Sequence, residues 1–418
     1  MCLTFIVCNA VFHERVMCMT KSAVLFLASC LLLACSQRTE MSHEKTPLLQ
    51  ESKVQTEKKK QIRMEKVSEI HLKEREKPYI GEISKISVSK NRLYLLNKTL
   101  KQILMYSMEG EIIRAIGRTG EGPGEFRYLY TMDVKDHLIA CYDQGTRRIT
   151  LFDTSGVFIR SFGTQTQMSI PSGNRVAITQ HHTILHCQKP RRLPKDEWRS
   201  YSSPWLICEL DTLGNVLSYY GEFDQEIVGD RLDRRLVEFE WSFPQFITTG
   251  ESHTYLWFFN LPIVVRYDES NAVSRVFNVA TPITKPRLID KDAEKDAARL
   301  RHLSNKERAR LDFETMKTEH VTISYFADIA YVAGHSLLLI MQTIDERRGI
   351  SYWNYSHYLS AYDLTTGHRL MTDMPLQSEK PVLYQRIATD AEGFLYYIQN
   401  DQPDDFVIGK YEIVLEEI

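Results

Sequence analysis

Short stretches in which hydrophobic and polar residues alternate run along most of the chain, separated by turns. The clearest series is 92–97, 102–107 and 111–116. A period of two over four to eight residues is typical of β-strands. We therefore predict consecutive antiparallel strands that are connected by tight turns.

Turns that contain an acidic residue and a glycine or asparagine recur along the chain. They stand at 108–110, 153–156, 211–214, 268–271 and 363–367, and the acids at 153, 211 and 268 are 58 and 57 residues apart. The next interval, from 268 to 363, is 95 residues and contains an insertion. A repeat of about 40 to 60 residues made of four short strands is typical of the blades of a β-propeller.

The repeat predicts six blades. The first five cover 83–117, 127–163, 174–221, 241–279 and 321–374, and the sixth begins at 383. Little chain remains after 413 for a fourth strand in the sixth blade, but the alternating segment 62–72 can supply it. Such closure removes free sheet edges, which would otherwise favour aggregation. The predicted fold class is all-β, a six-bladed β-propeller closed by an N-terminal strand, with a helical insertion between blades four and five.

The first 34 residues contain a leader. From Met19 the chain has a lysine, an apolar run from 23 to 33, and then Ala34-Cys35. This run is too short for a comfortable membrane-spanning helix and is typical of a signal peptide. The segment Leu32-Leu33-Ala34-Cys35 resembles the bacterial lipobox, in which the leader is cut before the cysteine and that cysteine is acylated. We interpret Met19 as the natural start; the alternative is a stray apolar N-terminus that happens to end in Ala-Cys.

Residues 35–60 form a second region, before the propeller at 61–418. Ten charged residues stand in 36–60, with no aromatic residue and no glycine. This composition indicates a flexible tether between a lipid anchor at Cys35 and the folded domain. By resemblance to other bacterial lipoproteins, Ser36 after the cysteine favours the outer membrane; a periplasmic and a surface-facing location both stay open.

One linker carries a further resemblance. Residues 116–126, Ile-Gly-Arg-Thr-Gly-Glu-Gly-Pro-Gly-Glu-Phe, are followed by Arg-Ile-Thr-Leu-Phe-Asp at 148–153 and by Gly156. This arrangement resembles an NHL-type repeat, and the mature chain with its lipobox resembles the six-bladed β-propeller lipoproteins of Bacteroidota. The match is good in blades one and two and weaker afterwards. The resemblance implies a fold and a cell-envelope location, without an agreed reaction.

Connection lengths divide the propeller into two faces. First-to-second and third-to-fourth connections of every blade belong to one face, which we call the short-turn face because they are uniformly short, as at 90–91 and 333–334. The other connections belong to what we call the loop-rich face, with long segments at 189–204, 222–240, 280–320 and 345–356. Long loops on a rigid scaffold are where binding sites usually lie.

Arginine and aromatic residues are concentrated in these long segments. Guanidinium groups suit carboxylates or phosphates, and flat rings suit sugars or peptide side chains. The alternative is that these side chains stack on one another and merely order the loops. The candidate ligand-binding residues are Arg191, Arg192, Trp198, Arg199, Tyr201, Arg231, Arg234, Arg235, Trp241, Arg347, Arg348, Tyr352 and Trp353.

The longest insertion, 285–320, has 18 charged residues in 36. Small and apolar residues at helical spacing and a capping box at 304–307 predict a helical hairpin. A solvated charged spacer is the alternative.

Charge and cysteine content narrow the function. The 52 Lys+Arg and 54 Asp+Glu leave a net charge of −2, which gives no bulk electrostatic reason to bind nucleic acid. Five of the eight cysteines stand in the first 35 residues. Of the others, Cys187 and Cys208 could form a disulfide across neighbouring strands, or they could be buried thiols like Cys141.

Motifs for metal, cofactor or nucleophilic chemistry are absent. The cluster His181, His182, His186 and Cys187 lacks a second ligand pair at zinc spacing, and the acids at 401, 404 and 405 are better explained as solvated loop residues than as a Ca²⁺ site. No G-x-S-x-G, H-E-x-x-H or Walker motif occurs. We therefore expect no cofactor and no metal.

The sequence favours a non-catalytic binding module anchored through Cys35. Its loop-rich face would bind an envelope protein, a peptide or an anionic glycan. The alternative is a propeller lyase or hydrolase with its site at the axial mouth of that face, where no local motif would reveal it. A purely structural subunit of an envelope complex is a third interpretation.

Overall fold

The computed structural model describes most of the chain after residue 59, with several gaps. It covers residues 60–73, 79–164, 176–187, 191–192, 201–203, 205–222, 244–250, 253–258, 261–278, 320–348, 352–376, 382, 385–402 and 405–417, which belong to one compact unit, Lys59–Ile418. These residues form strands and turns, with no helix among them, so none of the described segments is a helix that could span a bilayer.

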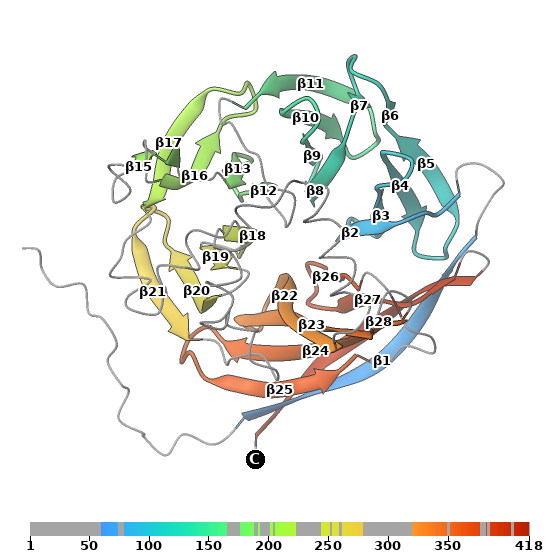
Figure 1. Cartoon of the computed structure of the whole chain (residues 1–418), viewed down its shortest axis with the longest axis vertical. Helices are drawn as coiled ribbons and strands as arrows, with labels where there is room; N and C mark the ends of the chain where they lie inside the picture. Colours follow the sequence, from blue (N-terminus) through green and yellow to red (C-terminus); the bar gives the residue numbers. More distant parts are fainter. Residues whose placement is uncertain are drawn as a thin grey trace, which may run out of the picture. The chain divides into compact units, whose positions relative to one another are not determined.

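Six four-stranded antiparallel sheets make up this unit (Figure 1). Blade 1 contains β2 (Ile83–Ser89), β3 (Arg92–Asn97), β4 (Gln102–Ser107) and β5 (Ile112–Ile116). Blade 2 contains β8 (Leu129–Lys135), β9 (Leu138–Asp143), β10 (Arg148–Asp153) and β11 (Phe158–Gly163). Blade 3 contains β12 (Val176–Ile178), β13 (Ile184–Cys187), β16 (Trp205–Leu210) and β17 (Val216–Glu222).

The remaining three blades follow the same order from the innermost strand outwards. Blade 4 contains β18 (Pro244–Thr249), β19 (Thr254–Phe258), β20 (Leu261–Tyr267) and β21 (Val273–Asn278). Blade 5 contains β22 (His320–Val332), β23 (Leu337–Arg348), β24 (Tyr352–Asp363) and β25 (Arg369–Pro375). Blade 6 contains β26 (Ile387–Thr389), β27 (Leu395–Gln402), β28 (Asp405–Glu417) and, outermost, β1 (Lys60–Leu72). The prediction of an all-β fold with six blades is confirmed.

The blades are arranged in a ring around their innermost strands. Each innermost strand contacts the next, in the order β2, β8, β12, β18, β22, β26 and back to β2. The outermost strand of blade 6 comes from the start of the described chain, since β1 pairs antiparallel with β28 from Lys60 opposite Glu417 to Leu72 opposite Phe406.

The core is divided into six hydrophobic clusters, one between each pair of adjacent blades. Strand β3 shows how the sequence produces this division. Its residues Leu93 and Leu95 pack in the cluster shared with blade 6, whereas Tyr94 and Leu96 pack in the cluster shared with blade 2. Side chains alternate between the two faces of a strand, and both faces of β3 are covered by a neighbouring blade. Consecutive positions of such a strand therefore all need apolar residues.

The recurring acidic turn has a structural role between blades. In blade 2, Asp153 Oδ1 accepts hydrogen bonds from the backbone N–H groups of Ser155 (2.8 Å) and Val157 (2.9 Å), and Gly156 adopts a φ of +85°, which a side chain would disfavour. Arg114 on β5 of blade 1 donates a hydrogen bond to the Ser155 carbonyl. The turn therefore joins the third and fourth strands of its own blade and also contacts the outer strand of the preceding one.

One predicted loop is wrong. Residues 345–348 and 352–356 belong to β23 and β24, which pair from Leu337 opposite Asp363 to Arg348 opposite Tyr352. The segment Tyr352-Trp-Asn-Tyr is rich in aromatic residues, which favour strands, so the hairpin is extended instead of opening into a loop. Arg347, Arg348, Tyr352 and Trp353 accordingly stand on paired strands.

Two other long segments predicted from the sequence are only partly described by the structure. A two-stranded sheet, β14 (Arg191–Arg192) with β15 (Tyr201–Ser203), lies within 189–204. The predicted helical hairpin at 285–320 lies outside the described residues, apart from His320, which begins β22.

Candidate functional site

The candidate ligand-binding residues that the structure describes lie on blades 3 and 5, at second-to-third strand connections of the loop-rich face. The structure pairs Arg347 with Trp353 and Arg348 with Tyr352 across the tip of the β23–β24 hairpin. It also pairs Arg192 with Tyr201 across β14 and β15. These are backbone pairings, and they place an arginine opposite an aromatic residue three times. Outside the described residues lie Trp198, Arg199, Arg231, Arg234, Arg235 and Trp241, together with the proposed lipidation site Cys35.

The β23–β24 hairpin is longer than its counterpart in blade 1. Its ladder has 12 residue pairs, whereas that of β3 and β4 has six. Six additional pairs at about 3.3 Å per residue extend the hairpin by about 20 Å. Because both hairpins start from a short-turn connection, the additional length lies at the end that belongs to the loop-rich face.

A further part of this face comes from the linker between blades 1 and 2, which sequence reasoning did not select. Tyr128 follows the glycine-rich segment and keeps 37% of its surface exposed. Its ring stacks on that of Tyr130, with centroids 6.2 Å apart. Tyr130 is partly buried against the cluster between blades 2 and 3, so Tyr128 is the exposed ring of the pair. An exposed aromatic ring on a connection of the loop-rich face is a suitable contact for a sugar ring or an apolar side chain.

Asp143, at the end of β9, holds this linker in place. Its fully buried carboxylate accepts hydrogen bonds from the backbone N–H groups of Arg127 (2.9 Å), Tyr128 (2.6 Å) and Gly145 (3.0 Å), and from the Thr146 hydroxyl (2.7 Å). Several hydrogen bonds to one ionised carboxylate are strong and directional. Tyr128 is therefore presented from a rigid backbone.

The same position in blade 1 holds Asn97, which is also fully buried. Its side chain donates to the Tyr79 carbonyl (2.8 Å) and accepts from the Leu100 N–H (3.1 Å). A polar residue directly after a fully apolar run, as in Tyr94–Asn97 and Ala140–Asp143, is the sequence signal that identifies this position.

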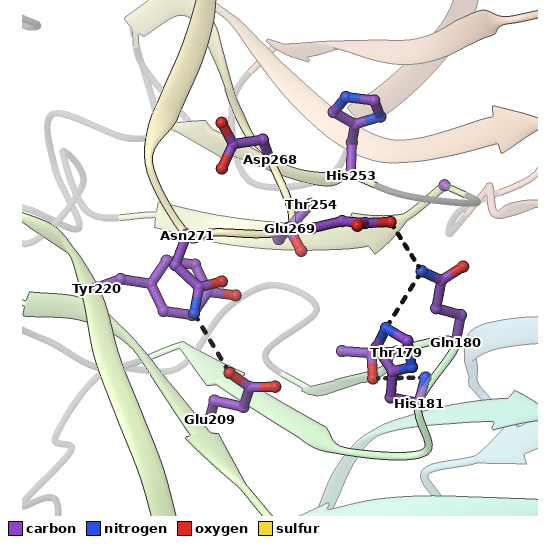
Figure 2. Close-up of a pocket in the computed structure, with 11 residues that line it drawn as sticks. Thr179, Gln180, His181, Glu209, Tyr220, His253, Thr254, Asp268, Glu269 and Asn271 are labelled. Carbon is purple, nitrogen blue, oxygen red and sulfur yellow. Dashed lines mark hydrogen bonds between the residues drawn. The ribbon is translucent and has the colours of Figure 1, made fainter.

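A small cavity lies on the opposite, short-turn face, between blades 3 and 4 (Figure 2). Its volume is about 80 Å³, below the roughly 300 to 1,000 Å³ of typical ligand pockets. Three turns surround it, those between β12 and β13, β18 and β19, and β20 and β21. The lining residues are Thr179, Gln180, His181, Glu209, Tyr220, Gly250, His253, Thr254, Asp268, Glu269 and Asn271.

The described residues that line this cavity include three carboxylates and no lysine or arginine. The Ser270 hydroxyl and the backbone of the β20–β21 turn, which hydrogen-bond to Asp268, hold the pKa of that carboxyl below its ordinary value. Burial lowers the pKa of His253, so at neutral pH this imidazole does not offset the negative charge.

Most of these polar groups bind one another. Glu209 accepts hydrogen bonds from the hydroxyls of Thr183 (2.7 Å) and Ser218 (2.9 Å), and Glu269 accepts one from the Gln180 amide (3.3 Å). Figure 2 shows the links from Glu209 to Asn271 and from Glu269 to Gln180, which run between the two blades. The network thus joins blades 3 and 4, and together with the small volume this makes the cavity a weak candidate for ligand binding.

The cysteine and histidine cluster does not come together. Strand pairing sets His186 opposite Cys208, and Cys187 opposite Ile207. Because an offset of one residue places side chains on opposite faces of a sheet, Cys187 packs between blades 3 and 4 and Cys208 between blades 2 and 3. All three body cysteines are free and buried, so the alternative of a 187–208 disulfide is wrong.

The histidines have separate surroundings. His182 lies in a turn 3.1 Å from Asp136, and His186 is buried with its ring 4.8 Å from that of Tyr142. Among the described residues, no group of His, Cys, Asp and Glu side chains could hold a metal ion.

An ion pair links two innermost strands that are not neighbours in the ring. Lys85 on β2 lies 3.3 Å from Asp328 on β22, and both side chains are largely buried. Asp328 also accepts hydrogen bonds from the backbone N–H groups of Ile329 (3.0 Å) and Ile387 (3.3 Å). The carboxylate thereby joins blades 5, 6 and 1 and is engaged in structural contacts.

Comparison with known proteins supports the fold. A sequence family described as "6-bladed beta-propeller", DUF5128, matches residues 37–170. A Bacteroides vulgatus protein of the DUF4221 family is similar in structure, with 14% identity, a TM-score of 0.55, and coverage of 85% of this chain and 99% of that chain. A Bacteroides fragilis protein has 12% identity, a TM-score of 0.52, and coverage of 85% and 95%. No curated protein matches the sequence.

At these identities the structural likenesses concern the fold alone. A virginiamycin B lyase from Staphylococcus aureus, with 10% identity and a TM-score of 0.46, covers 85% of this chain and 100% of that chain. A likeness at this level carries no argument about catalysis in this chain.

Proposed function

We propose that this propeller is a non-catalytic binding module of the bacterial cell envelope. Its loop-rich face binds an envelope protein, a peptide or an anionic glycan. An acylated Cys35 anchors the chain to the membrane, and residues 36–59 form the tether that leads into β1. Strand β1 pairs with β28 over 12 residue pairs. The proposed tether therefore leads directly into a strand that is held in blade 6.

The extended β23–β24 hairpin is the observation that supports this proposal most directly. It carries Arg347, Arg348, Tyr352 and Trp353 at its tip, in register, on backbone that is hydrogen-bonded on both sides of β23. Binding residues held on paired strands lose less conformational freedom when they bind than residues on free loops do. Tyr128 on its fastened linker adds an aromatic contact on the same face.

The enzyme alternative receives no specific support from the described residues. A lyase or hydrolase site needs an acid or base that is free to exchange a proton with a substrate. Asp328, the buried carboxylate on the innermost strands, is bound by a lysine and by backbone N–H groups. We therefore keep the binding module as the single proposal.

Co-purification from detergent-solubilised envelope tests this function. The tagged full chain is compared with a triple variant on the loop-rich face, Tyr128→Ala, Arg347→Ala and Trp353→Ala. A matched double variant on the short-turn face, Gln180→Ala and Glu269→Ala, is the control. Unfolding temperatures show whether each variant remains folded.

We expect a defined partner or glycan to be retained by the parent chain and the control variant, and to be lost by the triple variant. Equal retention by all three chains would contradict the assignment to the loop-rich face. If nothing is retained even by the parent chain, the binding-module proposal itself fails.

A further inference from the structure

The outer strands of three consecutive blades expose large apolar side chains. They come from β5, from β11 and from β17, together with the turns that precede the last two strands. Each keeps between 36% and 57% of its surface exposed. The six that define this apolar rim are Ile113, Val157, Phe158, Ile159, Leu213 and Leu217.

The other half of the rim differs. Among the described side chains of β21 and β25, no large apolar one is exposed, and β1 exposes only Val67 within the part that is described. Arg63, Lys66 and Glu69 form ion pairs on β1 instead. Single exposed apolar residues are common on protein surfaces, but a set confined to three adjacent blades indicates a contact surface.

The point where the chain enters the propeller relates this rim to a membrane. Lys60 pairs with Glu417, the last residue of β28, so β1 begins where the other blades have their third-to-fourth turn. Val157 and Leu213 lie in or directly after those turns of blades 2 and 3. The tether and the apolar rim therefore occupy equivalent levels of their blades.

Because the proposed tether is short, a weak contact between the apolar rim and the bilayer is enough to orient the propeller. Residues 36–59 number 24, and a flexible chain of this length has an average end-to-end distance of roughly 27 Å. A propeller held this close to a bilayer meets it at an effective concentration in the millimolar range. A few apolar side chains then suffice to hold one orientation.

Charges on the rim are compatible with a lipid surface. Arg160 on β11 is exposed and has no hydrogen-bond or ion-pair partner among the described residues. The nearby acids Asp153 and Asp211 are occupied by the N–H groups of their own turns. Apolar side chains next to a free arginine match acyl chains next to headgroup phosphates.

We propose that the apolar rim of blades 1 to 3 rests on the surface of the bilayer to which Cys35 is anchored. This inference rests on the lipid anchor in the proposed function. It adds an orientation, in which the short-turn ends of the outer strands face the lipid and the loop-rich face remains free for its partner.

Fluorescence quenching by labelled lipids tests the orientation. The full acylated chain is reconstituted into phosphatidylethanolamine and phosphatidylglycerol vesicles, and acylation is checked by partition into detergent. An environment-sensitive dye is attached to Ile159→Cys or Leu217→Cys. Ser274→Cys, exposed on β21, is the matched control. The parent chain, whose three body cysteines are free and buried, is labelled in parallel as background.

We expect the dye at 159 and 217 to shift to shorter wavelength and to be quenched by doxyl-labelled lipid several-fold more than the dye at 274. Equal emission and quenching at all three positions would overturn the inference, while partner binding in the co-purification assay would be unaffected. If the dyes at 159 and 217 also emit at shorter wavelength in detergent without vesicles, and sedimentation shows a dimer, the inference is overturned in favour of a contact between two copies of the chain. Absence of acylation would overturn it together with the anchor.

Discussion

The buried His357 makes the stability of the propeller depend on pH. Its side chain, 6% exposed on β24, lies between Thr343 on β23 and Val382 in the segment before β26. The Val382 carbonyl can only accept, so His357 Nε2 carries the hydrogen and donates it over 2.7 Å. Nδ1 then accepts from the Thr343 hydroxyl, 2.9 Å away. The neutral imidazole satisfies both contacts, whereas the imidazolium would have to donate from Nδ1 to the Thr343 hydroxyl oxygen, in a site where burial disfavours its charge.

The size of the stability loss on acidification follows from the pKa of this histidine. Burial, with a contribution from the nearby Arg386, lowers the pKa of His357 from 6.5 to about 4. Well above pH 6.5 this histidine is neutral in both the folded and the unfolded state, and it adds no pH dependence to the stability. As the pH falls, the unfolded state binds a proton first, so stability decreases by about 2 kcal/mol at pH 5 and by about 3 kcal/mol near pH 4.

Urea unfolding between pH 7.5 and pH 4.5 measures this loss. The matched variant is His357→Gln, because the glutamine Nε2–H can still donate to Val382 while the side chain no longer titrates. His368→Gln, at an exposed position, is the control. Other groups titrate in both parent and variant, so the difference between their unfolding free energies isolates His357.

We expect the glutamine variant to lose less stability than the parent chain between pH 7.5 and pH 5, by about 2 kcal/mol. The control variant should follow the parent chain. If all three chains lose stability in parallel, His357 becomes protonated in the folded state without cost, and the reasoning from its buried contacts is refuted.

Three further predictions concern buried groups. Replacing Lys85 by Met should destabilise the fold by about 3 kcal/mol in urea unfolding, because Asp328 stays buried without its cation. Replacing Arg63, which forms an exposed ion pair with Glu416, should lower the free energy of unfolding by less than about 1 kcal/mol. Asp143→Ala should cost about 3 kcal/mol and speed amide hydrogen exchange in the 127–128 linker, whereas unchanged exchange would contradict the fastening role. The body cysteines Cys141, Cys187 and Cys208 are buried, and burial raises the pKa of Cys208 to about 11 and that of Cys141 further. Ellman's reagent should therefore react with these thiols only after the chain unfolds. Rapid reaction of the native chain would contradict their burial.

Several features of the candidate site were predictable and others were not. The division into a short-turn and a loop-rich face follows from connection lengths, which are visible in the sequence. Tyr128 was missed because a glycine-rich linker gives no indication that a buried aspartate fastens it. The sequence predicts a loop at Arg347 and Trp353, and only strand pairing places them opposite each other on a hairpin. Their role in binding stays a prediction.

Local patterns alone determined the number of blades and most strand boundaries. Alternation and turn chemistry act over a few residues, so strands such as Arg92–Asn97 and Gln102–Ser107 can be identified without any knowledge of the fold. The recurring acid and glycine of the turns set the repeat for the same reason, since their hydrogen bonds connect residues only two to four positions apart.

Tertiary structure decided what depends on contacts between distant residues. The pair of Lys85 and Asp328 is separated by 243 positions, and the bond from His357 to Val382 crosses between segments 25 positions apart. The opposite orientation of Cys187 and Cys208 depends on a register offset of one residue between two strands. Such relations are set by how blades and strands pack, because no short-range pattern in the sequence encodes which residue will stand across an interface.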